Sequence, residues 1–180
     1  MLYTGGLKSR QDGIWLGIIV NLRIRHADDS DYPTIVCLVR ATLQDMESVG
    51  GHEVNQDENF WRKYADKIIQ SIRKGDRLYL LAQTDRSIVG FLEGKIVKPN
   101  EVFTHRKIFH ISLVYVILES RRQGIAASLA KEALRWASGQ GCHEADLNVL
   151  LNNEKGSRLY KKLGFNLFQY QFRMKLPTSA

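Results

Sequence analysis

The sequence predicts an α/β fold with a mixed sheet, in the element order βααβββαβαβ. A hairpin pattern over 77–97 indicates two antiparallel strands. The almost continuously apolar run 108–118 is typical of a central strand that is buried on both faces. An amphipathic helix follows that run at once, as in a helix that packs on a sheet. The 180 residues suit one domain with a sizeable core.

The first half of the chain has clear starts and stops for its elements. NLRIR alternates as a strand does, and the helix after it begins at the capping residues Asp29, Ser30 and Asp31 with an early proline. A second helix has its aromatic and aliphatic residues on one face and ends at Gly75. The predicted elements are a strand at 21–25, a helix through 28–46, a helix at 58–74, and hairpin strands at 77–83 and 88–97.

In the second half, a helix is predicted from Arg121 or Arg122 to Gln140, with half of its circumference apolar. The segment EADLNVL is typical of a strand, and NNEKGSRLYKKLG of a capped helix that closes with glycine. Large apolar side chains alternate with polar ones in the last segment, which predicts a final strand. These last three elements are expected at 144–150, 152–164 and 165–176.

The composition limits the function classes. The net charge of +7 favours phosphorylated ligands, but the basic residues are scattered and form no nucleic-acid reader motif. Two cysteines are too few for a disulfide framework, so a cytoplasmic location is expected. The apolar run within the first twenty residues is too short to span a membrane. We therefore expect an N-terminal extension at 1–20, a single domain at 21–180, and no membrane partner.

The stretch SRRQGIAASL, residues 120–129, places arginines and a glycine where a helix begins. A helix N-terminus presents unpaired N–H groups and the positive end of a dipole, and a bare backbone lets an anion approach them. The pattern Arg121-x-x-Gly124-x-Ala126 therefore predicts a phosphate site. The phosphate-loop and three-glycine dinucleotide patterns are both missing. The alternative is a helix cap with incidental arginines.

The segments VYVILESRRQGIAASLAKEALRWASGQG and LNVLLNNEKGSRLYKKLGF resemble the GNAT superfamily of acetyl-CoA-dependent N-acetyltransferases, most specifically from Ile108 to Phe165. The resemblance implies a mixed, mostly antiparallel central sheet flanked by helices on both faces. It also implies that acetyl-CoA is the cosubstrate. In the family the helix start binds the CoA pyrophosphate and the preceding strand pairs with the pantetheine arm. The residues at the matching positions are Tyr115, Val116, Arg121, Arg122, Gln123, Gly124, Ile125, Ala126 and Asn153.

The last predicted helix carries a second group of matching residues. Asn153, Gly156 and Tyr160 share one helix face by spacing. By the resemblance, the Asn bonds the pantetheine, a small residue lets the arm pass, and Tyr160 protonates the departing thiolate. Glycine in mid-helix costs about 1 kcal/mol relative to alanine, so we expect Gly156 to provide room. The alternative for Tyr160 is a half-buried aromatic that anchors the helix.

The attacking amine must lose a proton, and two side chains are candidate bases. His110 stands where some family members have a Glu, and an imidazole suits a base near neutrality. Its alternative is a satisfied core histidine. Glu93 is the second candidate, and its alternative is an edge residue that faces solvent. A water-mediated path without a dedicated base stays open as well.

Residues 41–61 contain five acidic side chains and no Lys or Arg. By the resemblance they border the acceptor site, so a cationic amine is expected there; the alternative is a solvated loop. The sequence thus predicts an N-acetyltransferase that acts on a primary amine of a small cationic molecule in a ternary complex. The alternatives are a protein Lys or N-terminal acetyltransferase and a non-catalytic acyl-CoA sensor. No metal is expected, and the oligomeric state, a homodimer included, stays open.

Overall fold

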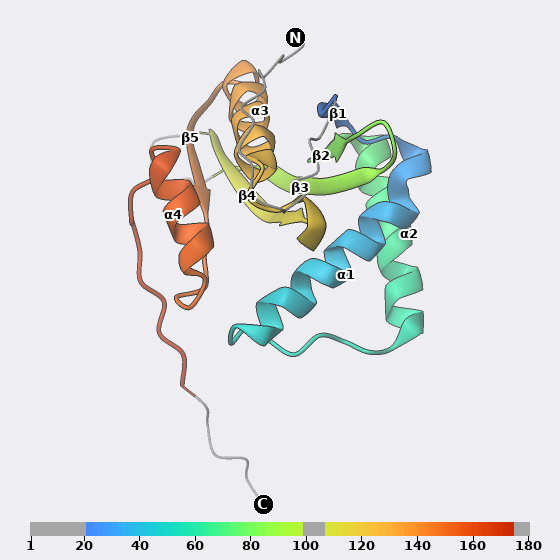
Figure 1. Cartoon of the computed structure of the whole chain (residues 1–180), viewed down its shortest axis with the longest axis horizontal. Coiled ribbons are helices and arrows are strands. Elements are labelled where there is room, and N and C mark those ends of the chain that lie inside the picture. The colour runs from blue at the N-terminus through green and yellow to red at the C-terminus, as the bar shows by residue number, and fades with distance from the viewer. Residues whose placement is uncertain (1–20, 99–106, 175–180) are drawn as a thin grey trace, which may run out of the picture.

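The computed structural model describes residues 21–98 and 107–174, which contain one five-stranded sheet in the order β1-β2-β3-β4-β5. The pairs from β1 to β4 are antiparallel, and β4 pairs with β5 in parallel. The mixed, mostly antiparallel sheet is therefore confirmed (Figure 1). Its strands are β1 (Arg23–His26), β2 (Arg77–Gln83), β3 (Ile88–Val97), β4 (Lys107–Val116) and β5 (Cys142–Leu147).

Helices cover both faces of this sheet, as expected. α1 and α2 lie on one face and α3 lies on the other (Figure 1). In the described part of the chain, no helix is both long enough and apolar enough to cross a bilayer. The helices are α1 (Tyr32–Ser48), α2 (Glu58–Lys74), α3 (Ile125–Gly139) and α4 (Glu154–Lys162), with single 3₁₀ turns η1 (Asp29–Asp31) and η2 (Leu118–Ser120).

Capping residues fix the ends of the first two helices. Asp28 and Asp31 form a capping box around η1, and Arg25 holds the Asp31 carboxylate with two hydrogen bonds of 2.6 and 2.7 Å. This ion pair ties β1 to the start of α1. Asp57 accepts the N–H of Asn59 at the start of α2, which ends at a left-handed Gly75.

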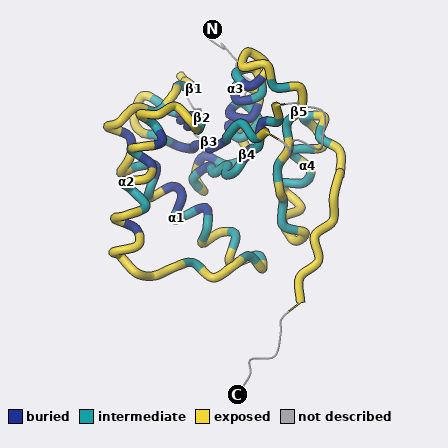
Figure 2. The backbone as a smooth tube through the Cα atoms, turned by 180° about the vertical axis from the view of Figure 1, so that it is seen from behind, coloured by how far each residue is buried: buried dark blue, intermediate teal, exposed yellow. Residues whose placement is uncertain are grey.

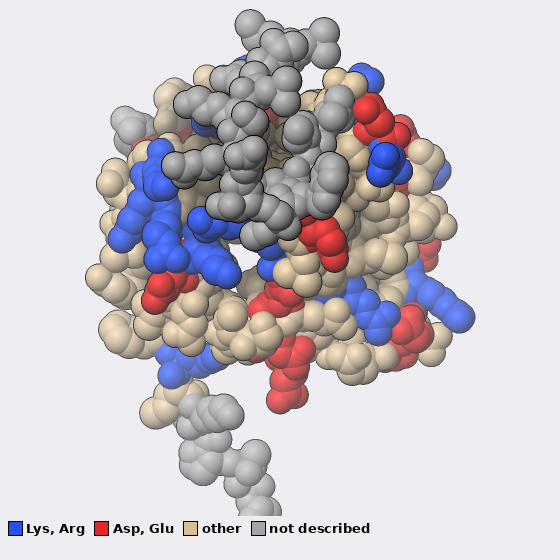
Figure 3. Space-filling model, in the orientation of Figure 1, with Lys and Arg blue, Asp and Glu red and all other residues tan. Residues whose placement is uncertain are grey.

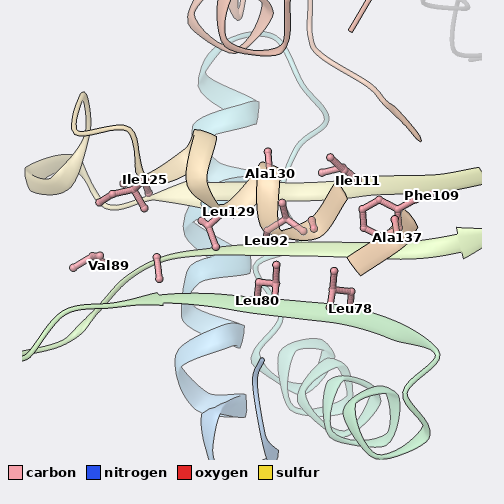
Figure 4. Close-up of a cluster of buried hydrophobic side chains, with 13 residues drawn as sticks. Leu78, Leu80, Val89, Leu92, Phe109, Ile111, Ile125, Leu129, Ala130 and Ala137 are labelled. Carbon is pink, nitrogen blue, oxygen red and sulfur yellow. The ribbon is translucent and has the colours of Figure 1, made fainter. Parts of the chain in front are cut away.

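Two apolar clusters, one on each face of the sheet, form the core. The α3 cluster joins Leu129 and Ala130 to side chains such as Leu92 and Phe109 of the strands, and Figure 4 shows these side chains facing one another. The second cluster joins α1 and α2 to the opposite face of β2 and β3. Figure 2 shows the buried positions concentrated in the central strands and the facing sides of α1 and α3.

The predicted final strand is wrong. Residues 165–174 form no strand, and 175–176 lie outside the described residues. A strand needs a neighbouring strand to bond to, and residues 165–174 have none among the described residues. Their large apolar side chains stay exposed, Phe168 and Phe172 by 95% each.

Several predicted boundaries shift as well. α3 begins at Ile125 rather than at the arginines, because the chain first makes the turn η2 and a left-handed step. β5 runs over Cys142–Leu147 instead of 144–150, and α4 is shorter by two residues at each end. β4 is only half-buried over much of its length, so burial on both faces is wrong. α2 and the β2–β3 hairpin match their predicted bounds, and the expected extension 1–20 lies outside the described residues.

Candidate functional site

The site begins where β4 and β5 separate. Their ladder runs from Lys107 opposite Cys142 to Ile111 opposite Leu147 and goes no further. Beyond that pair β4 continues to Val116 on β3 alone, with a bulge that leaves Ser112 unpaired. The edge of β4 that faced β5 is therefore free. In Figure 3 a hollow lies beside the Lys and Arg side chains that gather over α4.

The free edge presents backbone groups that no neighbouring strand pairs within the described residues. The N–H of Ile117 donates to the carbonyl of Val89 on β3 at 3.0 Å. Because backbone groups alternate in direction along a strand, those of Val114 and Val116 point away from β3 into the opening. Tyr115 pairs with Phe91 on the β3 side. Of the two predicted pantetheine-binding positions, the opening therefore exposes the backbone of Val116.

A phosphate-sized anion fits the corner after β4. Arg122 and Gly124 both have left-handed backbones, with φ of 67° and 81°, and they turn the chain into α3. The first N–H that bonds within the helix is that of Ser128, to Gly124, and no side chain caps the helix start. The preceding N–H groups are therefore free to bind an anion. A Cβ built on Gly124 meets no atom within 4 Å, so the space above the corner is open.

Arg121 is held by contacts within the chain. Its Nε donates to the Val116 carbonyl at 2.8 Å, and its guanidinium lies over the Tyr115 ring. Its Nη2 bonds the Asp45 carboxylate of α1 at 2.6 Å. Arg121 thus links the end of β4 to α1. Nearby, the Gln123 side-chain amide contacts the Glu119 carbonyl at 3.4 Å.

The second group of residues lies at α4 as expected, and the structure shows a role for Asn153 as the cap of this helix. The Oδ1 of Asn153 accepts the N–H of Gly156 at 2.9 Å and so caps the helix. A Cβ on Gly156 would lie 2.9 Å from the Asn153 side-chain nitrogen. Glycine therefore makes room for this cap. Tyr160 packs edge-on against Phe165, and burial raises the pKa of its hydroxyl to about 12, so it is protonated at neutral pH.

The two candidate bases lie in different surroundings on the α2 face of the sheet. Glu93 is 4% exposed and is ion-paired with Arg77, so its interpretation as a solvent-facing edge residue is wrong. Burial raises the pKa of the Glu93 carboxyl, and Arg77 opposes that rise. His110 lines a shallow cavity of about 240 Å³ and lies 2.6 Å, measured from Nδ1, from Oδ1 of Asp146.

Most of the acidic segment is bound within the chain. Asp45 and Glu58 pair with arginines, at 2.6 Å to Arg121 and 2.8 Å to Arg40. Two more acids accept backbone N–H groups. Glu47 accepts the N–H of Val54, and Asp57 accepts the N–H of Asn59 as the cap of α2. Four of its five acids therefore have structural roles, which reduces the charge that it offers to a ligand.

Sequence reasoning missed Asp146 beside His110. It counted Asp45 within the acidic segment but did not foresee its bond to Arg121. The alternation in EADL did signal that Glu144 and Asp146 share one strand face. The sequence alone does not show that Asp146 meets His110 or that Asp45 meets Arg121, because each pair joins two different elements of the fold. Within the described residues, no group of three or more His, Cys, Asp and Glu could hold a metal ion.

The α1–α2 loop meets residues on both sides of α4 in the sequence, one before the helix and one after it. The Asn152 side-chain amide approaches the Val49 carbonyl at 3.4 Å, and the Arg173 guanidinium donates to Gly50 at 2.9 Å. The candidate acceptor loop and α4 therefore lie on either side of one site.

Comparisons with known proteins agree with this geometry. A model described as the acetyltransferase (GNAT) family matches residues 38–165. Histone acetyltransferase MCC1 of Arabidopsis thaliana is 30% identical over 123 residues, which cover 57% of this chain and 50% of the relative. Aminoglycoside N(6')-acetyltransferase type 1 of Acinetobacter baumannii is 29% identical over 112 residues, covering 59% and 77%. The chain thus spans half of the first relative's length.

A solved structure gives the same fold. A predicted acetyltransferase from Clostridium acetobutylicum, crystallised with acetyl-CoA, has a TM-score of 0.70 and 16% identity. The alignment covers 86% of this chain and 96% of that one. At this identity the likeness supports the fold alone.

Proposed function

Because the chain belongs to the acetyltransferase (GNAT) family, we propose that it transfers acetyl from acetyl-CoA to the primary amine of a small cationic molecule. The observation that carries the proposal is the uncapped start of α3 beside the free edge of β4. The start of α3 provides N–H donors for a pyrophosphate, and the free edge of β4 can form strand-like hydrogen bonds with the amides of the pantetheine arm.

In this proposal the chain holds CoA at three places. The backbone of 122–126 binds the pyrophosphate, and the free edge of β4 at Val116 pairs with the pantetheine, while the Tyr115 backbone stays paired with Phe91 of β3. The Asn153 side-chain nitrogen donates to a pantetheine carbonyl, because its oxygen is used by Gly156. Arg121 shapes the corner through its hydrogen bond to the Val116 carbonyl. The pantetheine replaces this hydrogen bond when it binds.

The chemistry requires three proton transfers. The ammonium first loses a proton to a base, and its nitrogen then bonds the acetyl carbon. As the C–S bond breaks, the thiolate takes a proton from Tyr160, and the second proton of the nitrogen returns the tyrosinate to tyrosine. The raised pKa of Tyr160 keeps its hydroxyl protonated at neutral pH, so the hydroxyl can donate to the sulfur as the C–S bond breaks. His110 is the better base candidate, since it lines a cavity whereas Glu93 is buried against Arg77.

The proposed acceptor class rests on the relatives and on charge. An aminoglycoside acetyltransferase is among the relatives, Asp146 lines the cavity beside His110, and Glu53 is exposed in the α1–α2 loop. A protein acceptor is the second candidate, favoured by the histone acetyltransferase relative. The Tyr160 hydroxyl, as a candidate acid, speaks against a pure acyl-CoA sensor, which has no need to protonate a thiolate. A cytoplasmic location is proposed because the two cysteines are free.

A thiol-release assay with acetyl-CoA tests the proposal. The panel should contain aminoglycosides, polyamines, amino acids and a lysine peptide, with Gly124→Glu as the control that blocks CoA binding. We expect amine-dependent release of CoA with small cationic amines. Release only with the peptide would favour the second candidate. Calorimetric binding of acetyl-CoA without release in any arm would indicate a sensor.

A further inference from the structure

Asp146 lies beside His110 at the point where the sheet opens. The two residues are cross-strand partners in the parallel ladder, one step before its last pair. The Nδ1 of His110 and Oδ1 of Asp146 are 2.6 Å apart, the length of a strong bond to a charged acceptor. The next pair ends the ladder, so the imidazole stands at the closed end of the opening.

This bond fixes the two nitrogens of the ring. A carboxylate can only accept, so Nδ1 carries the hydrogen, and in the neutral ring Nε2 holds the free electron pair. Both residues line the same shallow cavity, together with Lys95, Val97 and Ile108. At about 240 Å³ the cavity is smaller than a typical ligand site, and suits only the reacting end of an acceptor.

The charged groups around the imidazole come from both neighbouring strands. Lys95 of β3 is the cross-strand partner of His110, and Glu93 of β3 interacts electrostatically with His110. Glu144 and Asp146 of β5 lie along the other side. Asp146 contacts the Nδ1 ring nitrogen. The Glu93 charge is directed to Arg77 instead.

We propose that Asp146 is a positioning residue, which holds His110 in the tautomer that lets Nε2 accept the proton of the acceptor ammonium. This inference rests on the proposed acetyl transfer and adds a residue to it. The His110 side chain is 25% exposed and reaches the cavity, so it can receive the proton directly or through one water. Asp146 does not touch the substrate in this scheme and acts through the ring.

The decisive variants are Asp146→Asn and His110→Gln, with Glu132→Gln as the control that removes a remote surface carboxylate. We expect His110→Gln to lower kcat by about 10²-fold or more. Asp146→Asn should lower kcat by about 10- to 100-fold, the loss that follows removal of the carboxylate partner from metal-bound histidines. The double variant should be no slower than His110→Gln alone, since Asp146 acts only through the ring.

The pH dependence separates positioning from structure. An alkyl amine such as that of lysine has a pKa of about 10.4, so above that pH the acceptor needs no base to become neutral. The ratio of wild-type to variant kcat should therefore shrink as the pH approaches 10. A constant ratio, or an additive double variant, would overturn the proposal. A rise of KM for the amine alone would also overturn it and would make Asp146 an acceptor-binding residue.

A measurement without substrate separates this proposal from the proposed function. Nitrogen-15 NMR of labelled histidine reports which ring nitrogen of His110 carries the proton. We expect Nδ1–H in the wild type and a tautomer mixture in Asp146→Asn. Nε2–H in the wild type would refute the positioning role even if acetyl transfer is found. The absence of acetyl transfer with every amine would refute the function while leaving the tautomer assignment intact.

Discussion

Replacing Gly94 by alanine should destabilise the fold strongly. A Cβ at this position would lie 2.3 Å from Cζ and 2.7 Å from Cε2 of Phe109. Normal carbon contacts are about 3.5–4.0 Å, so the overlap exceeds 1 Å. The Phe109 ring cannot move aside, since it is fully buried and packs against Trp136 at 5.7 Å.

The expected cost follows from this overlap. Overpacking a core costs about 1–3 kcal/mol, and a clash with an immobile ring belongs at the upper end, about 3 kcal/mol. In a protein of this size each kcal/mol lowers Tm by roughly 2–4 °C, so Tm should fall by roughly 6–12 °C. Differential scanning calorimetry and urea unfolding measure this directly.

Two further variants make the test specific. Gly139→Ala is the matched control: this glycine ends α3 and a Cβ there meets nothing within 4 Å. It should be neutral or stabilise by up to about 1 kcal/mol. Phe109→Leu should partly rescue Gly94→Ala, so that the double variant is less destabilised than the sum. A Tm for Gly94→Ala within 2 °C of the wild type (about 1 kcal/mol or less) would refute the close packing.

Three other predictions address the site and the response to acid. Tyr160→Phe should lower kcat by about 10²-fold with nearly constant CoA affinity, and wild-type turnover would leave Tyr160 a packing residue. Gly124→Glu should abolish CoA binding by calorimetry, because it strains a left-handed position and adds like charge; unchanged affinity would remove the phosphate site from this corner. Arg25 lowers the pKa of the Asp31 carboxyl, so this pair stabilises the fold above about pH 4 and the contribution is lost as pH falls through the folded-state pKa. In urea unfolding, the stability gap between wild type and Asp31→Asn should therefore be wide at pH 7 and narrow at pH 3, whereas equal gaps would contradict the role of the pair.

Local signals predicted the fold where they were sufficient. The α2 helix and the hairpin were predicted to the residue, because Asp57, Gly75 and the turn between the strands mark their ends within the sequence. The final strand was wrong because alternation shows which side chains share a face but supplies no bonding partner. The start of α3 was placed too early, since the left-handed Arg122 could not be foreseen in a non-glycine residue.

The site was predicted only in part, because local sequence signals reveal some of its residues but not the contacts between distant ones. The corner around Gly124 and the shared face of Asn153 and Tyr160 follow from spacing along the chain. The bonds of Asp146 to His110 and of Asp45 to Arg121 join residues 36 and 76 positions apart, and depend on strand register and on how α1 lies against β4. Such long-range pairs carry no signal in a single sequence.

The separation of β4 from β5 leaves the sheet unfinished between its last two strands. If the pantetheine arm fills that place, the ligand becomes a structural part of the protein, and its affinity and the stability of the fold rise together. At a free concentration 100 times Kd the gain is about 2.7 kcal/mol. The amide of Val116, which faces the opening, should then exchange its hydrogen more slowly once acetyl-CoA is bound. The lifetime of this protein in a cell would accordingly follow the local supply of acetyl-CoA.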